Sequence, residues 1–198
     1  VPQHTVVLED APAEPLGPGA FEALTGLATA GLAVSAAGVL AGARDLTADY
    51  VKNRQQFGRA LAEFQAVALQ LADVYVTSRT LDLAADNAVA AVADGRAATV
   101  DLKVAAYWAS QVAPYAFRTC HHLHGGMGVD VTYPLLAFTT WGTDIAHQLN
   151  TSAADVPVET AEAKNLELTE AQRSLKSEVR AYFAGLSHQG EPGDPGPE

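Results

Sequence analysis

Long stretches of apolar residues at helical spacing constrain the fold of this chain more than any other feature. Apolar side chains recur at steps of three and four residues between residues 21 and 56, and again over residues 63–94 and 99–123. Steps of three and four residues place side chains on one face of an α-helix. Each of these stretches therefore predicts a long helix that buries one face.

Alanine supplies a large part of these predicted faces, so the helix axes can approach one another closely. Gly95 follows the second helix at the position of a left-handed C-terminal cap, and Pro114 is expected to kink the third helix. The side chains predicted to be buried are Leu32, Ala36, Val39, Ala43, Leu46, Tyr50, Val67, Leu71, Val74, Leu81, Ala85, Ala88, Val92, Leu102, Ala105, Ala109, Val112, Ala116, Cys120 and Leu123.

The connections between these helices indicate the fold class. A fourth helix is expected to begin at Pro134, since proline fits the first turn of a helix. Long helices that are joined by short connections pack as antiparallel bundles. We therefore predict an all-α fold, an antiparallel four-helix bundle over residues 21–149. A short N-terminal strand segment at Val6–Leu8 and an extra C-terminal helix are expected to flank it.

The sequence on either side of the bundle differs from it in composition. Residues 1–20 are rich in proline and glycine, and residues 150–167 lack apolar periodicity, so both regions are interpreted as linkers. A capping box at Thr169–Gln172 opens residues 168–198, which are predicted to form a helix and then a mobile tail. The Val6–Leu8 strand has no partner within the chain, so we expect a preceding segment.

The charge balance disfavours several classes of partner. The chain holds 12 Lys and Arg residues against 23 Asp and Glu residues, a net charge of −11, whereas nucleic acids and anionic lipids recruit clustered cations. One cysteine, Cys120, allows no disulfide within the chain. We expect no nucleic-acid partner, no apolar run long enough for a membrane span and, without a secretion signal, a cytoplasmic location.

Two short segments carry residue types that are found in ligand sites. Arg54 and Phe57 lie at the end of the first helix, where a guanidinium can bind phosphate and a ring can stack on a planar group; an ordinary solvated helix end explains them as well. His121, His122 and His124 precede a glycine-rich turn. A metal site is disfavoured there, since no carboxylate lies at helical spacing from them. The glycines allow either close approach of a ligand or only a tight turn.

The order of several motifs resembles the C-terminal helical domain of the flavin-dependent acyl-CoA dehydrogenases. The resemblance covers residues 1–149 and rests on the motifs Arg54-Gln55-Gln56-Phe57-Gly58, Phe64-Gln65, His124-Gly125-Gly126-Met127-Gly128 and Tyr133-Pro134. It implies that residues 1–20 hold the end of a β domain, and that residues 168–198 open the N-terminal domain of a following unit. The chain then resembles part of a tandem (fused) or heteromeric actinobacterial enzyme.

The resemblance implies FAD as the cofactor and assigns residues to it by position. The residues that would contact the adenosine diphosphate half of an FAD, held mainly by a neighbouring unit, are Arg54, Gln56, Phe57, His122, Gly125 and Gly126. His122 stands where the family usually has Gln, although an imidazole can also donate a hydrogen bond. No metal is implied.

The carboxylate that removes the substrate α-proton in this family is missing from both of its usual positions. Near the end of the fourth helix that position is Leu149, and the alternative position early in the first helix is Ala28. The Arg-Asp pair that is usual in the family is replaced by Thr140 and Trp141. Because Leu and Ala cannot accept a proton, the resemblance implies a catalytically silent unit without a catalytic residue of its own.

The expected function is part of an FAD-dependent acyl-CoA dehydrogenase, which desaturates an acyl-CoA thioester between its α and β carbons. Similar actinobacterial enzymes include some that act on steroid side-chain CoA thioesters. This segment would complete the FAD site of another dehydrogenase unit in a homo- or hetero-oligomer. That unit would hold the acyl-CoA, with an electron-transfer flavoprotein as redox partner. The alternatives are a purely structural oligomerisation bundle with vestigial FAD contacts and, less favoured, a hydrolase or metal protein that uses the histidines.

Overall fold

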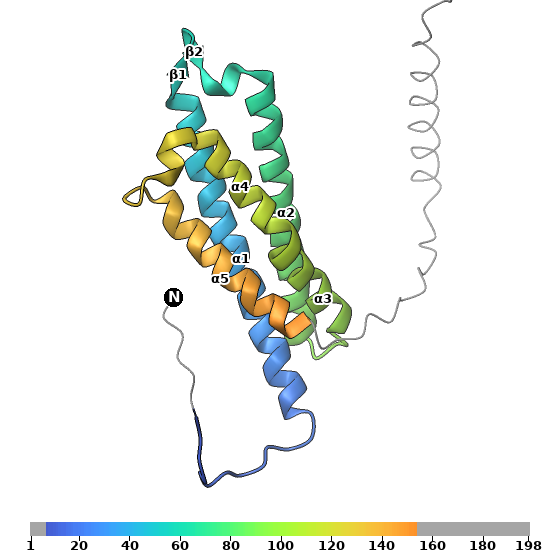
Figure 1. The fold of residues 1–198 in the computed structure, drawn as a ribbon. Helices are drawn as coiled ribbons and strands as arrows, with labels where there is room; N and C mark the ends of the chain where they lie inside the picture. Colours follow the sequence, from blue (N-terminus) through green and yellow to red (C-terminus); the bar gives the residue numbers. More distant parts are fainter. Residues whose placement is uncertain (1–6, 154–198) are drawn as a thin grey trace, which may run out of the picture. The chain divides into compact units, whose positions relative to one another are not determined.

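The computed structural model describes residues 7–153 (Figure 1). The predicted linker over residues 150–167 begins inside this range, and the predicted C-terminal helix and tail lie outside it. The first residue of the predicted Val6–Leu8 strand also lies outside it. Val7 and Leu8 are exposed and form no strand, since no second strand within residues 7–153 lies beside them to accept their hydrogen bonds.

Long helices form an antiparallel bundle, and this confirms the predicted all-α fold. The helices are α1 (Ala20–Asn53), α2 (Gln65–Ala93), α3 (Thr99–Tyr107), α4 (Ala113–His124) and α5 (Leu135–Ala153). Helix α1 packs along α2 and α5, and α2 also packs against α4. Figure 1 shows α1, α2, α4 and α5 side by side, with α3 near the end at which α1 begins. Helix α5 extends beyond residue 149, where the sequence predicts the start of a linker.

The predicted kink in the third helix is present as a change of helix type. Helix α3 ends at Tyr107, a π-helical turn η2 occupies Trp108–Val112, and α4 begins at Ala113. Pro114 has no N–H to continue the ladder of an α-helix through this point, which accounts for the break. Gly95 ends α2 with a φ of 63° and donates its N–H to the carbonyl of Val92, as the predicted cap requires.

Small side chains fill the interior of the bundle. The side chains predicted to be buried are buried or half-buried. Further alanines on the long helices are buried as well. The core consists of Ala33, Ala36, Ala37, Leu40, Ala43, Val74, Leu81, Ala84, Ala85, Ala88, Ala105, Ala106, Ala109, Ala113, Ala116, Phe117, Cys120, Leu135, Ile145 and Leu149. Because so many of these side chains are alanines, the contact surfaces of the helices come close to the backbone.

Helix α1 is long and apolar enough, by length and composition alone, to cross a membrane. This corrects the expectation that no apolar run reaches that length: an 18-residue window of α1 has a mean hydropathy of 1.7. The same composition arises in a helix that packs in the core of a bundle. Helix α1 packs against α2 and α5, so its buried face is part of the core of the bundle.

The first helix is shorter at its C-terminal end than the sequence predicts. It ends at Asn53 rather than Gln56, and Gly58 lies beyond its end. The chain then forms a small antiparallel hairpin of β1 (Gln55–Gln56) and β2 (Arg59–Ala60), followed by the 3-10 turn η1 (Leu61–Glu63). The extended backbone of Arg54, with a ψ of 122°, ends the helix, because its next N–H turns towards a strand partner instead of a helical carbonyl.

Helix α5 approaches α1 at a glycine, and this contact can be tested. A Cβ atom added to Gly42 would lie 2.5 Å from Cε1 of Phe138, so Gly42→Ala is expected to lower the free energy of unfolding by about 1–3 kcal/mol. Urea unfolding of the purified protein, followed by circular dichroism, measures this change.

Gly38→Ala, one helical turn earlier, is the matched control. A Cβ atom at Gly38 would meet nothing within 4 Å, so only the higher helix propensity of alanine remains, a gain of up to about 1 kcal/mol. If Gly42→Ala stabilised the protein as much as Gly38→Ala, this result would contradict the close contact between Phe138 and α1.

Candidate functional site

The hairpin after α1 is built on a tight two-residue turn. Gln55 pairs with Ala60 and Gln56 with Arg59, and the N–H of Leu61 donates to the carbonyl of Arg54 at 2.9 Å. The turn residues are Phe57 and Gly58, with φ values of 54° and 80°. Positive φ at both central residues is typical of a type I′ turn, whose twist matches that of paired strands.

Phe57 is an unusual residue for this turn. Type I′ turns favour Asn-Gly, and a side chain with a bulky ring costs about 1–2 kcal/mol in the left-handed region. The Phe57 ring is nevertheless 92% exposed, and it has an edge contact with Phe64 at 6.3 Å between ring centroids. A strained backbone that holds an aromatic ring in solvent makes Phe57 a candidate for a role in binding.

Of the remaining polar side chains of the hairpin, one packs on a neighbouring ring and the others are exposed. The guanidinium of Arg59 lies 3.9 Å from the centre of the Phe64 ring, so it covers that ring. Arg54 and Gln56 are exposed. Arg54 is held by its backbone, since its N–H donates to the carbonyl of Tyr50 at 2.8 Å. The three hairpin residues assigned by the resemblance are therefore all available for contact from outside the bundle.

The glycine-rich turn η3 (Gly125–Val129) follows α4, and its glycines have different roles. Gly125 has a φ of 56°, which accounts for glycine at the helix end. A Cβ atom at Gly125 or Gly126 would meet nothing within 4 Å, so the backbone here is open to a ligand. Gly128 is buried instead, and a Cβ there would lie 2.9 Å from the carbonyl oxygen of His121. The turn thus combines a tight bend with an accessible stretch of backbone.

The hairpin and the glycine turn lie at the same end of the bundle (Figure 1). The last turn of α1 contacts the last residue of α4, because the Tyr50 and His124 rings stack with centroids 4.4 Å apart and an interplanar angle of 23°. The Tyr50 hydroxyl also donates to the His124 carbonyl at 3.3 Å. The structure therefore joins the two segments that the sequence singled out separately.

The three histidines before the turn have three different environments. His121 Nε2 lies 3.0 Å from the Thr139 hydroxyl, His122 is exposed, and His124 is only 2% exposed. Among residues 7–153, no three His, Cys, Asp or Glu side chains converge in a way that could hold a metal ion. The histidine run thus contributes one exposed side chain, His122, beside the glycine turn.

The two positions that the resemblance assigns to a catalytic base differ in environment. Leu149 is fully buried and belongs to the core of the bundle, whereas Ala28 is exposed on α1. Trp141 is 53% exposed on α5. Of these three positions, only Leu149 faces the interior of the bundle.

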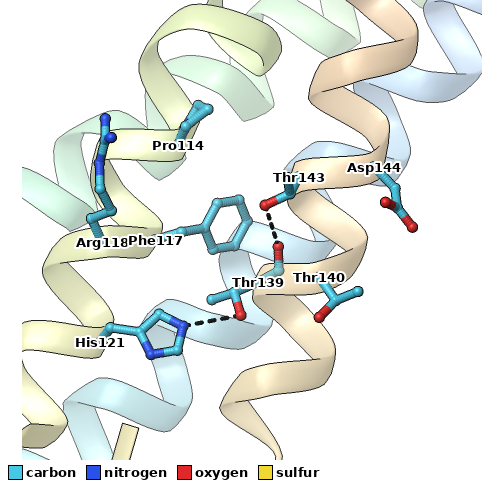
Figure 2. Close-up of a pocket in the computed structure, with 8 residues that line it drawn as sticks. All are labelled: Pro114, Phe117, Arg118, His121, Thr139, Thr140, Thr143 and Asp144. Carbon is cyan, nitrogen blue, oxygen red and sulfur yellow. Dashed lines mark hydrogen bonds between the residues drawn. The ribbon is translucent and has the colours of Figure 1, made fainter. Parts of the chain in front are cut away.

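A shallow groove of about 500 Å³ lies between α4 and α5 (Figure 2). The Phe117 ring fills its centre, where it packs directly on Gly142. The Thr143 hydroxyl donates to the Thr139 carbonyl at 2.8 Å, and the Thr139 hydroxyl contacts His121. Arg118 turns to the Tyr115 ring, 4.3 Å from its centre. Because these polar groups bind one another, they do not converge on a common ligand.

The environment of His124 favours the neutral imidazole. Its Nδ1 lies 2.8 Å from the Cys120 carbonyl, which can only accept, so Nδ1 carries the proton. Its Nε2 is buried and has no hydrogen-bond partner within residues 7–153. Burial therefore lowers the His124 pKa, an effect that the Cys120 carbonyl opposes and that nearby His121 reinforces.

Two groups near His124, the Cys120 thiol and the Tyr133 hydroxyl, hold their protons more tightly than usual. Burial raises the pKa of the Cys120 thiol on the same helix. Burial and the nearby Tyr50 raise the pKa of Tyr133, whose ring lies 5.3 Å from that of His124. Protonation of His124 would consequently place an uncompensated charge in this corner, which is unfavourable in a buried site.

This arrangement predicts a loss of stability in acid. An unfolded His has a pKa near 6.5, so as the pH falls the unfolded chain binds a proton before the folded one does. The free energy of unfolding is therefore expected to decline below about pH 6.5, and to decline less in His124→Phe. Urea unfolding at about pH 7.5 and about pH 5.5 measures the difference.

His122→Asn serves as the control, since His122 is exposed. This variant is expected to keep the acid sensitivity of the natural sequence. A His124→Phe variant that lost as much stability on acidification as the natural sequence would contradict the assignment of the effect to His124.

Sequence reasoning missed two features of this site. The hairpin was hidden because strands of two residues carry no apolar alternation, although Phe57-Gly58 holds a glycine at the second turn position. The contact between Tyr50 and His124 was hidden because 74 residues separate the two side chains along the chain. Only the packing of α4 against α1 brings them together.

Comparisons with known proteins agree with this architecture. The family described as "Acyl-CoA dehydrogenase, C-terminal domain" matches residues 22–165. The acyl-CoA dehydrogenase FadE28 of Mycobacterium tuberculosis is 50% identical over 123 residues, which are 62% of this chain and 36% of that protein. This chain thus spans about a third of the length of that curated relative.

Two solved structures of related complexes have the same fold. A variant of the Tcur3481-Tcur3483 steroid ACAD matches with a TM-score of 0.66 and 35% sequence identity, covering 83% of this chain and 42% of that one. The ChsE4-ChsE5 complex from Mycobacterium tuberculosis matches with a TM-score of 0.59 and 29% identity, covering 68% of this chain and 39% of that one. With the family match over more than half of its length, the chain belongs to the acyl-CoA dehydrogenases, an FAD-dependent family, and carries their C-terminal domain.

Proposed function

We propose that this chain completes the FAD site of another dehydrogenase unit and does not itself abstract the substrate proton. The observation that carries the proposal is the exposure of every assigned residue at one end of the bundle. The exposed residues are Arg54, Gln56, Phe57, His122, Gly125 and Gly126. Ligand sites bury most of the surface of their ligand, so the proposal places a neighbouring dehydrogenase unit over this open surface.

The chemistry of the exposed groups fits the nucleotide half of FAD. Arg54 presents a guanidinium, the donor best suited to the oxygens of a pyrophosphate. Gln56 and His122 add further hydrogen-bonding groups, and Phe57 adds a ring face for a planar base. Gly126 leaves its backbone uncovered. These groups would hold and orient the nucleotide, and none of them is placed to accept a carbon-bound proton.

The redox chemistry would then take place on the partner unit. When bound, FAD supplies the oxidant that takes up a hydride from the β carbon of an acyl-CoA. Removal of the α-proton needs a carboxylate within hydrogen-bond reach, and neither Leu149 nor Ala28 provides one. The buried position of Leu149 supports a silent unit. The partner would therefore contribute both the base and the acyl-CoA pocket.

The names of two similar structures support a proposal for the substrate class and the further partners. One similar structure is named a steroid ACAD and another is a complex of two different chains. These names support a heteromeric assembly and a steroid side-chain CoA thioester as substrate class. An electron-transfer flavoprotein would reoxidise the flavin, as the resemblance implies.

A purely structural role as an association bundle is the second candidate. Its support is a set of exposed apolar side chains on the outer surface. Leu69, Val76 and Leu83 recur at steps of seven on α2 and are 59%, 60% and 62% exposed, and α3 carries Val100 and Val104. Covering such side chains favours association by about 25 cal/mol per Å². A stoichiometry of one FAD per two dehydrogenase units, with Arg54 away from any part of an FAD, would favour this role.

Arg54→Ala separates the two functions. Loss of a guanidinium that binds phosphate is expected to weaken FAD binding by the complete assembly about tenfold to hundredfold. The flavin content after gel filtration, from the absorbance ratio of flavin to protein, and FAD titration of the stripped assembly measure this effect. Unchanged flavin content would contradict the proposal.

Arg79→Ala provides the matched control. Arg79 is also an exposed arginine, but it lies on α2, away from the hairpin, and pairs with Asp82. Its removal is expected to leave the FAD affinity unchanged, which excludes a general effect of lowered positive charge.

Phe57→Asn tests whether the strained turn serves binding. Asn adopts positive φ more readily than Phe, so the thermal stability of the assembly without flavin is expected to be unchanged or higher by up to about 1 kcal/mol. The FAD affinity is expected to fall, because the ring is lost. A variant that gained stability and kept its FAD affinity would show that Phe57 has no role in binding.

A further inference from the structure

A series of contacts runs from the backbone of Arg54 to the glycine turn. The Arg54 N–H donates to the Tyr50 carbonyl at 2.8 Å, and the Tyr50 hydroxyl donates to the His124 carbonyl at 3.3 Å. His124 immediately precedes Gly125. The two parts of the site, separated by about seventy residues in sequence, are therefore connected by two hydrogen bonds and one stacked pair of rings.

His124 is itself fixed from several directions. Its Nδ1 donates to the Cys120 carbonyl, its ring stacks on Tyr50, and the tilted Tyr133 ring lies 5.3 Å away. The next N–H, that of Gly125, donates to the His122 carbonyl. With the side chain and the following peptide both held, a shift of Tyr50 would be passed on to the glycine turn.

The contact between Tyr50 and His124 includes a buried polar atom that makes it unfavourable as a purely stabilising contact. The buried Nε2 of His124 lacks a hydrogen-bond partner within the described residues, and such an atom costs about 1–3 kcal/mol. Two apolar side chains of similar size would fill the same space without that cost. The polar contact adds a defined orientation, because the hydrogen bond from Tyr50 fixes the carbonyl that leads into Gly125.

We propose that Tyr50 and His124 are positioning residues that set the spacing between Arg54 and the Gly125–Gly126 turn, so that both contact one dinucleotide. The inference rests on the proposed function. Neither residue touches the ligand: His124 is buried and Tyr50 is half-buried beneath the two exposed segments. They act through the backbone of the residues that follow them.

Removal of the Tyr50 ring is the primary test. In the complete assembly, Tyr50→Leu is expected to raise the Kd for FAD about tenfold, whereas Tyr50→Phe, which keeps the stacked ring, raises it about threefold. The Kd is measured by FAD titration of the stripped assembly, and thermal unfolding without flavin is measured in parallel. Saturating FAD is expected to restore the maximal rate, since the chemistry lies elsewhere.

Tyr107→Leu is the control for loss of a tyrosine from the bundle. Tyr107 lies on α3, remote from the hairpin, and is 58% exposed. Its replacement is expected to leave the Kd unchanged. If Tyr50→Leu lowered the thermal stability but left the Kd for FAD unchanged, the contact would be structural only and the inference would be overturned.

A double-mutant cycle keeps the inference testable if Tyr50→Leu does not assemble. Tyr50→Phe is expected to have a smaller effect on the Kd in the Arg54→Ala background, because its action passes partly through Arg54. Additive effects would overturn the inference. The failure of the proposed function is distinguishable, since Arg54→Ala would then leave the Kd unchanged by itself.

Discussion

Close approach of helices through small side chains is the constraint on which this structure depends. Helix α1 presents alanines to its neighbours, and the Phe138 ring of α5 lies against Gly42. The Phe117 ring of α4 lies in the same way against Gly142 of α5. A large ring that packs over a missing side chain holds the two helix backbones close together, because a Cβ atom at Gly42 or Gly142 would clash with that ring. The ends of α1 and α4 are thereby held at one level.

The relative position of the ends of α1 and α4 is important because the hairpin and the glycine turn are extensions of these two helix ends. The hairpin begins where α1 stops, and the glycine turn begins where α4 stops. Neither has a core of its own, so each takes its position from the helix behind it and from the contact between Tyr50 and His124. The result is an open surface at one end of the bundle. Arg54 and Phe57 are exposed on this surface, which is consistent with the proposed completion of a partner's FAD site.

The buried Leu149 contributes to the stability of the bundle. At the position that the resemblance assigns to the base, a leucine contributes to the core, and burial of a leucine side chain stabilises a protein by about 1.5–3 kcal/mol. A carboxylate in the same place would be removed from water without a partner, which is strongly unfavourable. In the proposed silent unit, Leu149 therefore contributes to the stability of the bundle at a position where an active unit would carry a catalytic carboxylate.

The amino-acid sequence alone determined the helical class, the helix faces and the break near Pro114, because these depend on spacing over a few residues and on the missing N–H of proline. It also identified Arg54, Phe57 and the diglycine turn as unusual, through local composition and a resemblance. The sequence did not reveal the hairpin, the positive φ of Phe57, or the contact of Tyr50 with His124. Those features were decided by the tertiary structure, since contacts between residues far apart in sequence arise only once the helices have packed.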